Sequence, residues 1–502
     1  MNRIARNTLY LYGRQLFVVI LSLYISRLVL QTLGIDDFGI FNVVGSVITM
    51  FNFLNAGMIQ ATQRFMSYEV GKGSRIRQRE VFSTLLLIHA IIAIIVFVAV
   101  ETIGFWFLHS QMNIPAGRLD TAVVVLHSSL ITYIIGVMTT PFSSAIAAHE
   151  HFGIPALLGI VDAMLKLGGI VMIASQTGDR LFLYAVMLIA VSLIGTGVNI
   201  TYCWRHFEEV SLRPRLIPRH FQRILNFAGW QVVGNIGYMG RLSGVNIVIN
   251  LMCGVAVNAA RGVAVQATAQ INGFASTFMA AIMPQITKRY ARRDYDNMIG
   301  LVMKGSKYTF LLLYLLALPF CLRCHYVMKL WLGEVPLYAE EFVILLFIVV
   351  MIDILASPLG QAINATGDIK WFQTSMAVVI LTDIPLTYLI LSVTDRPYYA
   401  ILSGIVISLM AWGVRICFLK RRITTFSFIM YFREIVRGLL AAMVSLAVCL
   451  FLNRFVPEGL FGLSLIIAIT VLSNAFFFYL IAMNMEEKSI IREVIYAHIH
   501  IK

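Results

Sequence analysis

The stretch LYLYGRQLFVVILSLYISRLVL, residues 9–30, is long and apolar enough to cross a bilayer as one helix, yet it contains Arg14 and Arg27. A spanning helix needs about 20 mostly apolar residues. Each arginine placed among them costs about 3 kcal/mol or more in hydrocarbon. The two arginines therefore need an explanation that a simple membrane anchor does not supply.

Apolar runs of this kind recur along the whole chain of 502 residues. Hydrophobic residues make up 59% of the sequence and charged residues 13%, and the mean hydropathy is +0.83. These values lie far above those of a water-soluble globular protein of this length. We expect an all-α, polytopic membrane protein with no separate soluble domain. The first apolar run continues past Leu30 without a small-residue cleavage site, so we expect a retained helix rather than a signal peptide.

Short polar connections divide the chain into about fourteen expected membrane helices. Their expected ranges are 8–33, 38–62, 81–107, 120–147, 154–175, 181–204, 226–252, 256–284, 302–323, 340–362, 371–393, 398–419, 435–453 and 460–484.

The chain also resembles itself at an offset of about 216 residues. The matching pairs are Gly13-Arg14-Gln15 with Gly229-Trp230-Gln231, PFSSAIAA from Pro141 with PLGQAINA from Pro358, and Gly178-Asp179-Arg180 with Thr394-Asp395-Arg396. A repeat of six helices, an even number, predicts two parallel six-helix bundles around a central cavity, followed by two further helices. The expected domains are 1–204, a cytoplasmic linker at 205–225, 226–422, and 423–502 with the last two helices and a tail.

The formal net charge of +14 is a topology signal, because the basic residues gather in alternate connections between helices. By the positive-inside rule, the loops at 64–80, 205–224 and 286–298 and both termini are expected to be cytoplasmic. Nucleic-acid binding would require a solvated basic face, which this distribution does not provide. We therefore expect no nucleic-acid partner.

Few residues suggest catalysis, a cofactor or a metal. The run C-L-R-C-H at 321–325 matches a haem-attachment pattern, but the match is too short to support a haem. We interpret His149 and His151 as part of a solvated turn, since two histidines are not a complete metal site. The GxxxxGK[ST] loop is absent. We expect a transporter rather than an enzyme, with no cofactor and no metal.

Polar residues form stripes on the helices expected at 8–33, 38–62, 226–252 and 256–284. Arg14, Arg241 and Arg261 each share a helix with such a stripe, which favours a lined cavity. The alternative is that polar side chains join helices, while Arg27, Arg64 and Lys304 extend from helix ends to the lipid headgroups. The candidate lining residues are Gln15, Ser22, Asn42, Asn235, Tyr238, Asn246 and Asn272.

Acidic residues are fewer inside the expected spans. Glu101 and Asp383 are candidates for ion coupling, because carboxylates inside membranes recur in proton relays. Asp353 also lies within an apolar run. Asp162 stands four residues before Lys166, a spacing that predicts an ion pair along one helix.

Three stretches resemble bacterial O-antigen and polysaccharide-biosynthesis flippases of the multidrug/oligosaccharidyl-lipid/polysaccharide (MOP) superfamily. They are LGIDDFGIFNVVGSVITMFNFLNAGMIQATQRFMSYEVGKG at 33–73, LWLGEVPLYAEEF at 330–342 and PLGQAINATGDIK at 358–370. The resemblance implies two bundles around a cavity that opens alternately to each side of the bacterial inner membrane. It also implies an undecaprenyl-pyrophosphate-linked oligosaccharide as cargo, within membrane lipid, with a polysaccharide polymerase and glycosyltransferases as candidate partners.

In related flippases, arginines on the first and eighth helices engage the pyrophosphate, and this resemblance suggests that role here for Arg14 or Arg27 and for Arg261. We assign Arg241 to the pyrophosphate as well, because it shares the helix expected at 226–252 with a polar stripe. Guanidinium groups suit phosphate oxygens, because they donate two parallel hydrogen bonds. The sugars would follow the polar stripes. The alternative is an ion-coupled MATE-type antiporter for multidrug cations, which would rely on membrane acids. The first helix has arginines and no acid, which favours an anionic cargo. A membrane scaffold without transport is a third alternative, in which the stripes only pack helices.

Overall fold

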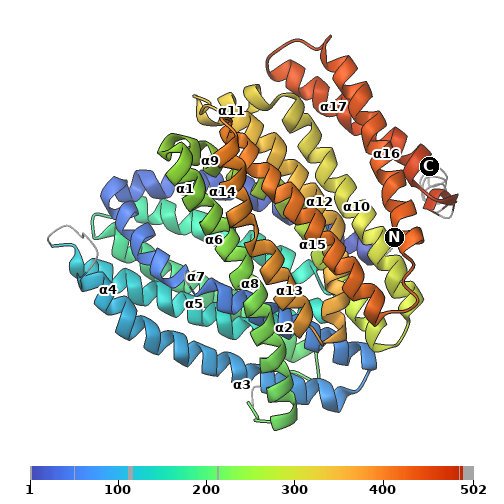
Figure 1. Ribbon diagram of the computed structural model, residues 1–502. Coiled ribbons are helices and arrows are strands. Elements are labelled where there is room, and N and C mark those ends of the chain that lie inside the picture. Colours follow the sequence, from blue (N-terminus) through green and yellow to red (C-terminus); the bar gives the residue numbers. More distant parts are fainter. Residues whose placement is uncertain (1–2, 50, 111–116, 212–213, 486, 490–502) are drawn as a thin grey trace, which may run out of the picture. The chain divides into compact units, whose positions relative to one another are not determined.

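The computed structural model describes residues 3–49, 51–110, 117–211, 214–485 and 487–489. All regular secondary structure in these residues is helical, and no β-strand occurs among them (Figure 1). The expectation of an all-α protein is confirmed. Residues 490–502, which include most of the tail that we expect to be cytoplasmic, lie outside the described residues.

Eleven helices in the described part of the chain are long and apolar enough to cross a membrane. The chain is thus polytopic, but the expected count of about fourteen is not confirmed. The three expected spans at 38–62, 226–252 and 256–284 are not among the eleven. All three lie in the regions where we expected polar stripes. The helices concerned are α2 (Asn52–Lys72), α8 (Pro218–Cys253) and α9 (Val255–Ala291).

The chain forms two compact units that share the long helices. Unit 1 comprises residues 1–236, 280–294 and 364–374, and unit 2 comprises residues 237–279, 295–363 and 375–502. The expected domain boundaries near residues 204 and 226 remain a prediction.

Unit 1 is built mainly from the first seven α-helices. Helix α1 contains one non-helical residue, Gly34, whose φ of 80° and ψ of 172° separate two helical segments. Only glycine adopts such angles without strain, which explains why the apolar run turns at this point. The other helices are α3 (Arg75–Ala99), η1 (Val100–Gly104), α4 (Phe105–Ser110), α5 (Leu119–Ala148), α6 (Gly153–Ala174) and α7 (Arg180–His206), after α1 (Arg3–Thr49).

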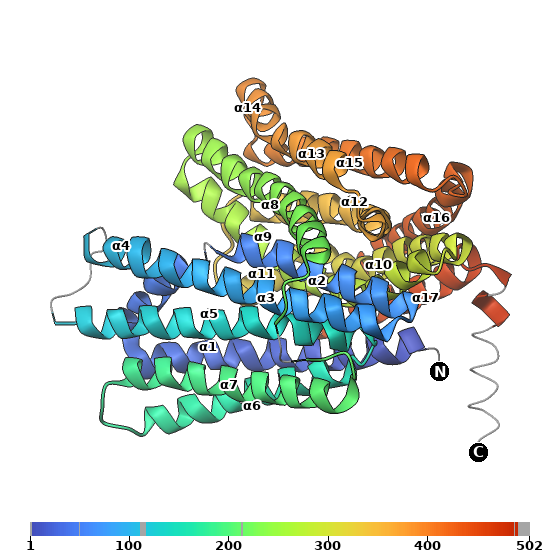
Figure 2. The same ribbon diagram turned by 90° about the horizontal axis from the view of Figure 1, so that it is seen from below.

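The core of unit 1 lies where α1, α5, α6 and α7 run side by side (Figure 2). Val44, Val125, Ile170 and Leu181, one from each of these helices, belong to a single buried apolar cluster. At the start of α7, the Asp179 side chain accepts hydrogen bonds from the backbone N–H groups of Leu181 and Phe182, at 3.1 and 3.3 Å. This cap satisfies donors that a helix start leaves unpaired.

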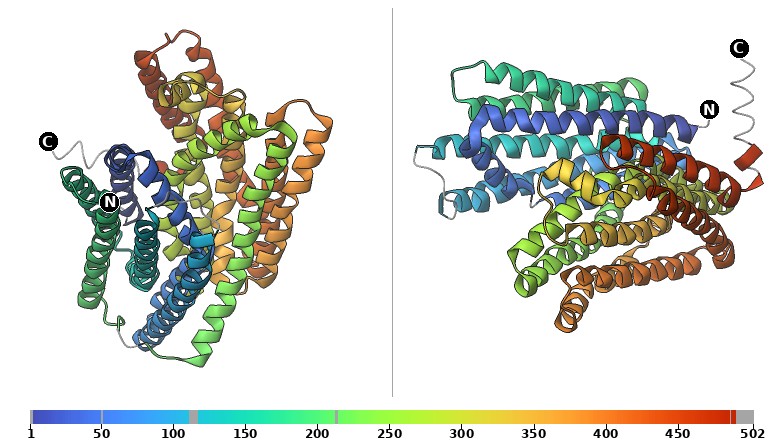
Figure 3. Two further views of the ribbon diagram at one scale, coloured as in Figure 1. Left: turned by 90° about the vertical axis from the view of Figure 1, so that its left-hand side faces the viewer. Right: turned by 90° about the horizontal axis from the view of Figure 1, so that it is seen from above.

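Unit 2 contains most of the remaining helices, while parts of α8, α9, α12 and α13 belong to unit 1. Phe342, Phe347 and Met328 lie at the centre of its main apolar cluster. The two helices expected last in the sequence form the neighbouring pair α16 and α17, drawn in red in Figure 3. The helices are α10 (Tyr295–Leu322), α11 (Cys324–Leu332), α12 (Ala339–Thr366), α13 (Lys370–Leu381), α14 (Asp383–Val393), η2 (Pro397–Tyr399), α15 (Ala400–Arg422), α16 (Phe428–Asn453), α17 (Leu460–Phe477) and η3 (Phe478–Ala482).

Two of the repeated sequence segments occupy matching places in their own helices. PFSSAIAA forms the last turns of α5 and contains Pro141, and PLGQAINA lies in the last turns of α12 and contains Pro358. A proline inside a helix removes one backbone hydrogen bond and bends the helix locally. The sequence repeat is therefore also a repeat of local structure.

Candidate functional site

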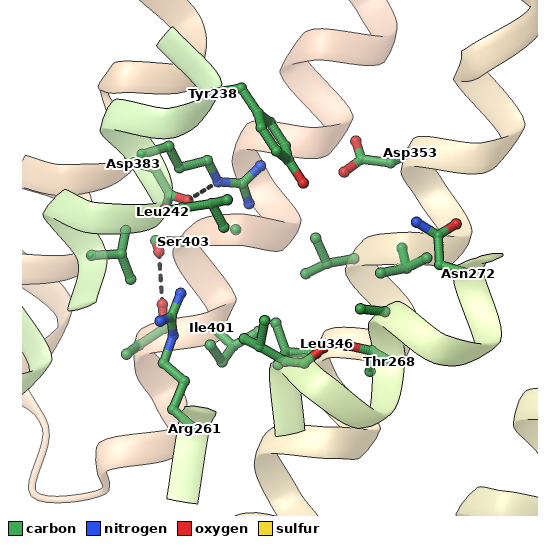
Figure 4. A pocket seen from close by; sticks show the side chains of 18 residues that line it. Tyr238, Leu242, Arg261, Thr268, Asn272, Leu346, Asp353, Asp383, Ile401 and Ser403 are labelled. Atoms are coloured by element: carbon green, nitrogen blue, oxygen red, sulfur yellow. Dashed lines mark hydrogen bonds and ion pairs between the residues drawn. The ribbon is translucent and has the colours of Figure 1, made fainter. Parts of the chain in front are cut away.

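A cavity of about 140 Å³ lies inside unit 2, between α8, α9, α12, α14 and α15 (Figure 4). Four of the residues predicted for the site face it, namely Tyr238, Arg241, Arg261 and Asn272, together with the ion-coupling candidate Asp383. The sequence separates these residues widely, and the helix arrangement brings them to one place. Further polar lining residues are Thr268, Asp353 and Ser403.

Arg241 and Asp383 form an ion pair at one side of the cavity. The Arg241 Nε lies 2.5 Å from the Asp383 Oδ2, and the two side chains are only 13% and 4% exposed. A Cβ atom added at Gly404 would lie 3.0 Å from the Arg241 Nη2, so the glycine leaves room for this guanidinium. A buried arginine and a buried carboxylate thus neutralise each other. We had predicted separate roles for them.

Arg261 is the second arginine of the cavity, and its environment differs. The side chain is buried and donates from Nη1 to the Asn246 Oδ1. Its Nε is also buried and has no hydrogen-bond partner. Buried donors are nearly always paired in proteins. Arg261 therefore brings to the cavity a positive charge with an unused donor.

Tyr238 and Asp353 approach the cavity from opposite sides. Figure 4 shows the Tyr238 hydroxyl directed toward the Asp353 carboxylate, with Asn272 beside it. Asp353 stands in α12 and is close enough to Arg415 of α15 for their charges to interact. The Nη1 of Arg415 is buried without a hydrogen-bond partner. The sequence indicated Asp353 only as one of several acids inside the expected spans, and Arg415 was not predicted. Both residues are charged and lie in the middle of apolar runs, which is the sequence feature that could have indicated a functional role.

The charges that line the cavity balance, because two arginines face two aspartates. Asp383 neutralises the charge of Arg241 through their ion pair. Among the described residues, the arginine that lines the cavity without such an ion pair is Arg261. The arrangement can hold an anion at Arg261 and polar groups at Tyr238, Asn272 and Thr268. Asn235 of α8 belongs to unit 1 and does not line this cavity, and it has an interaction partner of its own.

The predicted residues of α1 and α2 belong to unit 1. Arg14 packs on α6, where a Cβ at Gly159 would lie 2.9 Å from both the Arg14 Cδ and Nε. The Arg14 Nε is buried without a hydrogen-bond partner, and Gln15 beside it is half-buried. Arg27 is exposed.

Two other predicted lining residues of unit 1 hydrogen-bond to their own helix. The exposed Ser22 donates to the backbone carbonyl of Val19 at 3.0 Å. The exposed Asn42 donates from Nδ2 to the carbonyl of Phe38 at 2.8 Å. A role of either residue toward a cargo remains a prediction.

Two acidic residues of unit 1, Glu101 and Asp162, have ionic partners. Glu101 lies in the π-helical turn η1, and its Oε1 is 3.1 Å from the Nε2 of His127. The expected pair of Asp162 with Lys166 is confirmed, with 2.8 Å between Oδ2 and Nζ. The ion-coupling role of Glu101 remains a prediction.

Arg64 was expected to reach the headgroups from a helix end, and this expectation is wrong. The residue is only 7% exposed, and its Nη2 donates to the backbone carbonyl of Ala365 at 3.0 Å. The guanidinium carbon lies 4.5 Å from the ring centroid of Phe65 and 4.8 Å from that of Tyr68. Aromatic faces attract cations, which explains how this arginine is held inside the protein.

The turn at His149 and His151 was expected to be solvated, and both histidines are half-buried. The His149 Nε2 lies 2.5 Å from the Glu209 Oε1, and Glu209 is only 5% exposed. Between the two histidines, Glu150 is buried and accepts from the Lys288 Nζ at 2.6 Å. Burial is the largest single influence on the pKa of Glu209 and would raise it, but the hydrogen bond from His149, a backbone hydrogen bond and the charges of His149 and Arg75 together hold that pKa below its ordinary value.

Comparison with protein families found no family model that matches this sequence. One curated protein, named uncharacterized membrane protein EpsK, from Bacillus subtilis (strain 168), is 21% identical over 327 residues. The match covers 63% of this chain and 63% of that protein, so the shared region spans less than two thirds of the relative.

Several solved structures are similar in fold. A mutant MATE protein aligns with a TM-score of 0.72 at 14% identity, over 84% of this chain and 96% of that one. An outward-facing multidrug resistance MATE family transporter of the MOP superfamily gives 0.71 at 13%, over 84% and 95%. A MOP superfamily transporter from Pyrococcus furiosus Vc1 (DSM3638) gives 0.68 at 12%, also over 84% and 95%. The chain therefore has the all-helical fold of MATE and MOP superfamily transporters.

Proposed function

We propose that this chain is a flippase for lipid-linked oligosaccharides. It would move an undecaprenyl-pyrophosphate-linked glycan from the cytoplasmic to the outer leaflet of a bacterial inner membrane, where a polysaccharide polymerase could extend it. Glycosyltransferases would supply the cargo on the cytoplasmic side. The MOP-type fold supports a transport role, and the sequence stretches that resemble polysaccharide flippases support the class of cargo.

The observation that carries this proposal is the state of Arg261. A buried guanidinium with an unused Nε donor lies in a polar cavity. Of the ligands that a transporter meets, a pyrophosphate matches such a group best, because its oxygens accept charge-assisted hydrogen bonds. The sugars would meet the hydroxyl and amide groups of Tyr238, Thr268 and Asn272.

A second function, an ion-coupled multidrug cation antiporter of the MATE type, is favoured by Asp353. This carboxylate lines the same cavity and forms no ion pair with another described residue. A carboxylate in that position could bind an organic cation or a coupling proton. The archaeal MOP transporter is described as having a binding pocket of reversed polarity that suggests a different function. The charge of the cavity is thus the feature that separates the two functions.

A deletion strain distinguishes the two functions. If the chain is the flippase, loss of the gene reduces surface glycan and leaves lipid-linked oligosaccharide on the cytoplasmic side, and the wild-type gene restores export. If it is the cation antiporter, loss of the gene leaves the glycan unchanged and increases sensitivity to toxic organic cations. Arg261→Gln at matched expression should fail to restore glycan, whereas Asp353→Asn should restore it.

A further inference from the structure

A second polar cavity lies in unit 1, away from the cavity that contains Arg261. It has a volume of about 460 Å³ and lies between the end of α2, the first turns of α8 and the turn from α12 to α13. We propose that this cavity is a binding site for a phosphate group, of the kind carried by an anionic lipid headgroup or by a free phosphate. The proposal is independent of the cargo proposed above. Its main residues are Arg64, Arg223, Asn226, Trp230, Asp368 and Lys370.

Arg64 provides a fixed cation in the wall of this cavity. It is more than nine-tenths buried, and its guanidinium stacks over Phe65, Tyr68 and Phe227. One terminal nitrogen donates to Ala365, while the buried Nε has no hydrogen-bond partner. A guanidinium held by aromatic rings loses little freedom when it binds an anion, because its position is already set.

The turn opposite Arg64 is shaped to admit this guanidinium. Gly367 has a φ of +83°, and a Cβ there would lie 2.5 Å from the Arg64 Nη2 and 2.9 Å from its Cζ. Any other residue would therefore be strained and would displace Arg64. Two residues after Asp368, helix α13 begins at Lys370. A helix start presents free backbone N–H groups and a partial positive charge, which favour a bound anion.

Two exposed cations complete the site. Arg223 of α8 lies close enough to Arg64 for the two charges to repel each other, and neither forms an ion pair with another described residue. The Lys370 ammonium lies 5.4 Å from the ring centroid of Trp230. Three cations thus face the cavity against one carboxylate, Asp368. Like charges gathered in this way are stabilised when an anion binds between them.

The neighbouring side chains suit a phosphate that carries a polar substituent. The Trp230 Nε1 donates to the Asn226 Oδ1 at 2.9 Å, so the Asn226 amide nitrogen remains as a donor. The loops at 64–80 and 205–224 are predicted to be cytoplasmic, where anionic phospholipids are concentrated. A phosphoglycerol headgroup therefore fits the chemistry, and a soluble phosphate offers the same oxygens.

Calorimetry on the purified full-length protein in nonionic detergent can test this site. The probes are short-chain phosphatidylglycerol, short-chain phosphatidylcholine and inorganic phosphate. The variant Arg223→Gln/Lys370→Gln removes two exposed charges from the cavity. The control Arg77→Gln/Arg79→Gln removes two exposed charges of the α3 start, which do not line it.

We expect phosphatidylglycerol to bind the wild-type protein and the control alike, and the cavity variant at least about tenfold more weakly, as charge-assisted contacts predict. Tighter binding of phosphatidylglycerol than of inorganic phosphate identifies a lipid headgroup as the ligand. Equal or tighter binding of inorganic phosphate, with the same loss in the cavity variant, identifies a soluble phosphate. Binding that is absent from the wild-type protein, or equal in the cavity variant and the control, overturns the proposal.

Discussion

Two cavities among the membrane helices differ in charge: the cavity of unit 2 that contains Arg261 has charged lining residues, whereas a cavity of unit 1 separate from the one at Arg64 has none among its described residues. In unit 2, Arg241, Arg261, Asp353 and Asp383 line a space of about 140 Å³. In unit 1, α1, α2, α5 and α7 line a larger cavity of about 270 Å³ without a charged side chain. The polar groups of the unit 1 cavity are those of Asn52, Ser128, Ser129, Thr132 and Tyr133.

This difference shows that the two sequence repeats share local helix structure but differ in the charged side chains that line their cavities. Each charge inside a membrane protein costs free energy, so it persists where it has a partner or a task. Arg241 and Asp383 neutralise each other, and Arg261 has an unused hydrogen-bond donor. The neutral cavity of unit 1 has no such charges and serves as the natural control for the charged one.

The largest expected effect is a loss of stability caused by Asp383→Asn in the charged cavity of unit 2. The substitution preserves shape but leaves the Arg241 charge buried without a counterion, which costs about 3–5 kcal/mol. We expect a clear loss of thermal stability in detergent. Asp353→Asn should change stability far less, because Asp353 forms no ion pair with another described residue. Equal unfolding temperatures for the two variants would show that the ion pair is not structurally important.

The next effect concerns transport. Arg261→Gln keeps a polar side chain but removes the cation, and we expect transport to fall about ten- to hundredfold, as the loss of one charge-assisted contact implies. Lysine should rescue in part, because it keeps the charge but not the forked donor. Thr132→Val in the neutral cavity is the matched control, since the Thr132 hydroxyl is buried without a partner. Equal losses in both variants would remove the distinction between the cavities.

A smaller effect is expected for Tyr133→Phe in unit 1. The Tyr133 hydroxyl donates to the backbone carbonyl of Phe51 at 2.9 Å. Losing this hydrogen bond should cost about 1 kcal/mol of stability. Transport by the folded protein should stay at the wild-type level, because the neutral cavity does not hold the cargo. A transport defect without a stability defect would place the cargo in unit 1.

The smallest expected effect is a pH dependence of unit 1. The pKa of Glu209 is lower in the folded protein than its ordinary value, so the unfolded chain takes up this proton first as the pH falls. The stabilisation by Glu209 is therefore complete above its unfolded pKa, about 4.3. It is lost as the pH falls further, through the folded pKa. Glu209→Gln should flatten stability against pH in this acidic window. A variant that keeps the wild-type slope there would exclude the contribution.

The sequence predicted what depends on composition and on local spacing. The apolar runs indicated an all-α polytopic protein, and the spacing of Asp162 and Lys166 predicted their ion pair, because residues four apart meet on one helix. The partners Arg241 and Asp383 are 142 residues apart, and no periodicity relates them. We could name both residues as candidates but could not predict that they neutralise each other.

The burial of Arg64 was also beyond the reach of the sequence. Its position near a helix end is typical of an arginine that extends to the headgroups, and the aromatic rings and the Ala365 carbonyl that hold it come partly from distant segments. The contact of His149 with Glu209 could not be predicted for the same reason, since the helices α6 and α7 separate the two residues in sequence. Helix identity is a local property, whereas burial at helix ends depends on tertiary packing.

Transport by the purified protein in proteoliposomes tests the central claim most directly, namely that the charged cavity selects an anionic, pyrophosphate-linked cargo. Two cargoes are offered to the same wild-type preparation, an undecaprenyl-pyrophosphate-linked oligosaccharide and a fluorescent organic cation. We expect the oligosaccharide to reach the opposite leaflet and the cation to remain where it was added, with or without a proton or sodium gradient. Uptake of the cation without movement of the oligosaccharide would contradict the claim and assign the cavity to cation antiport.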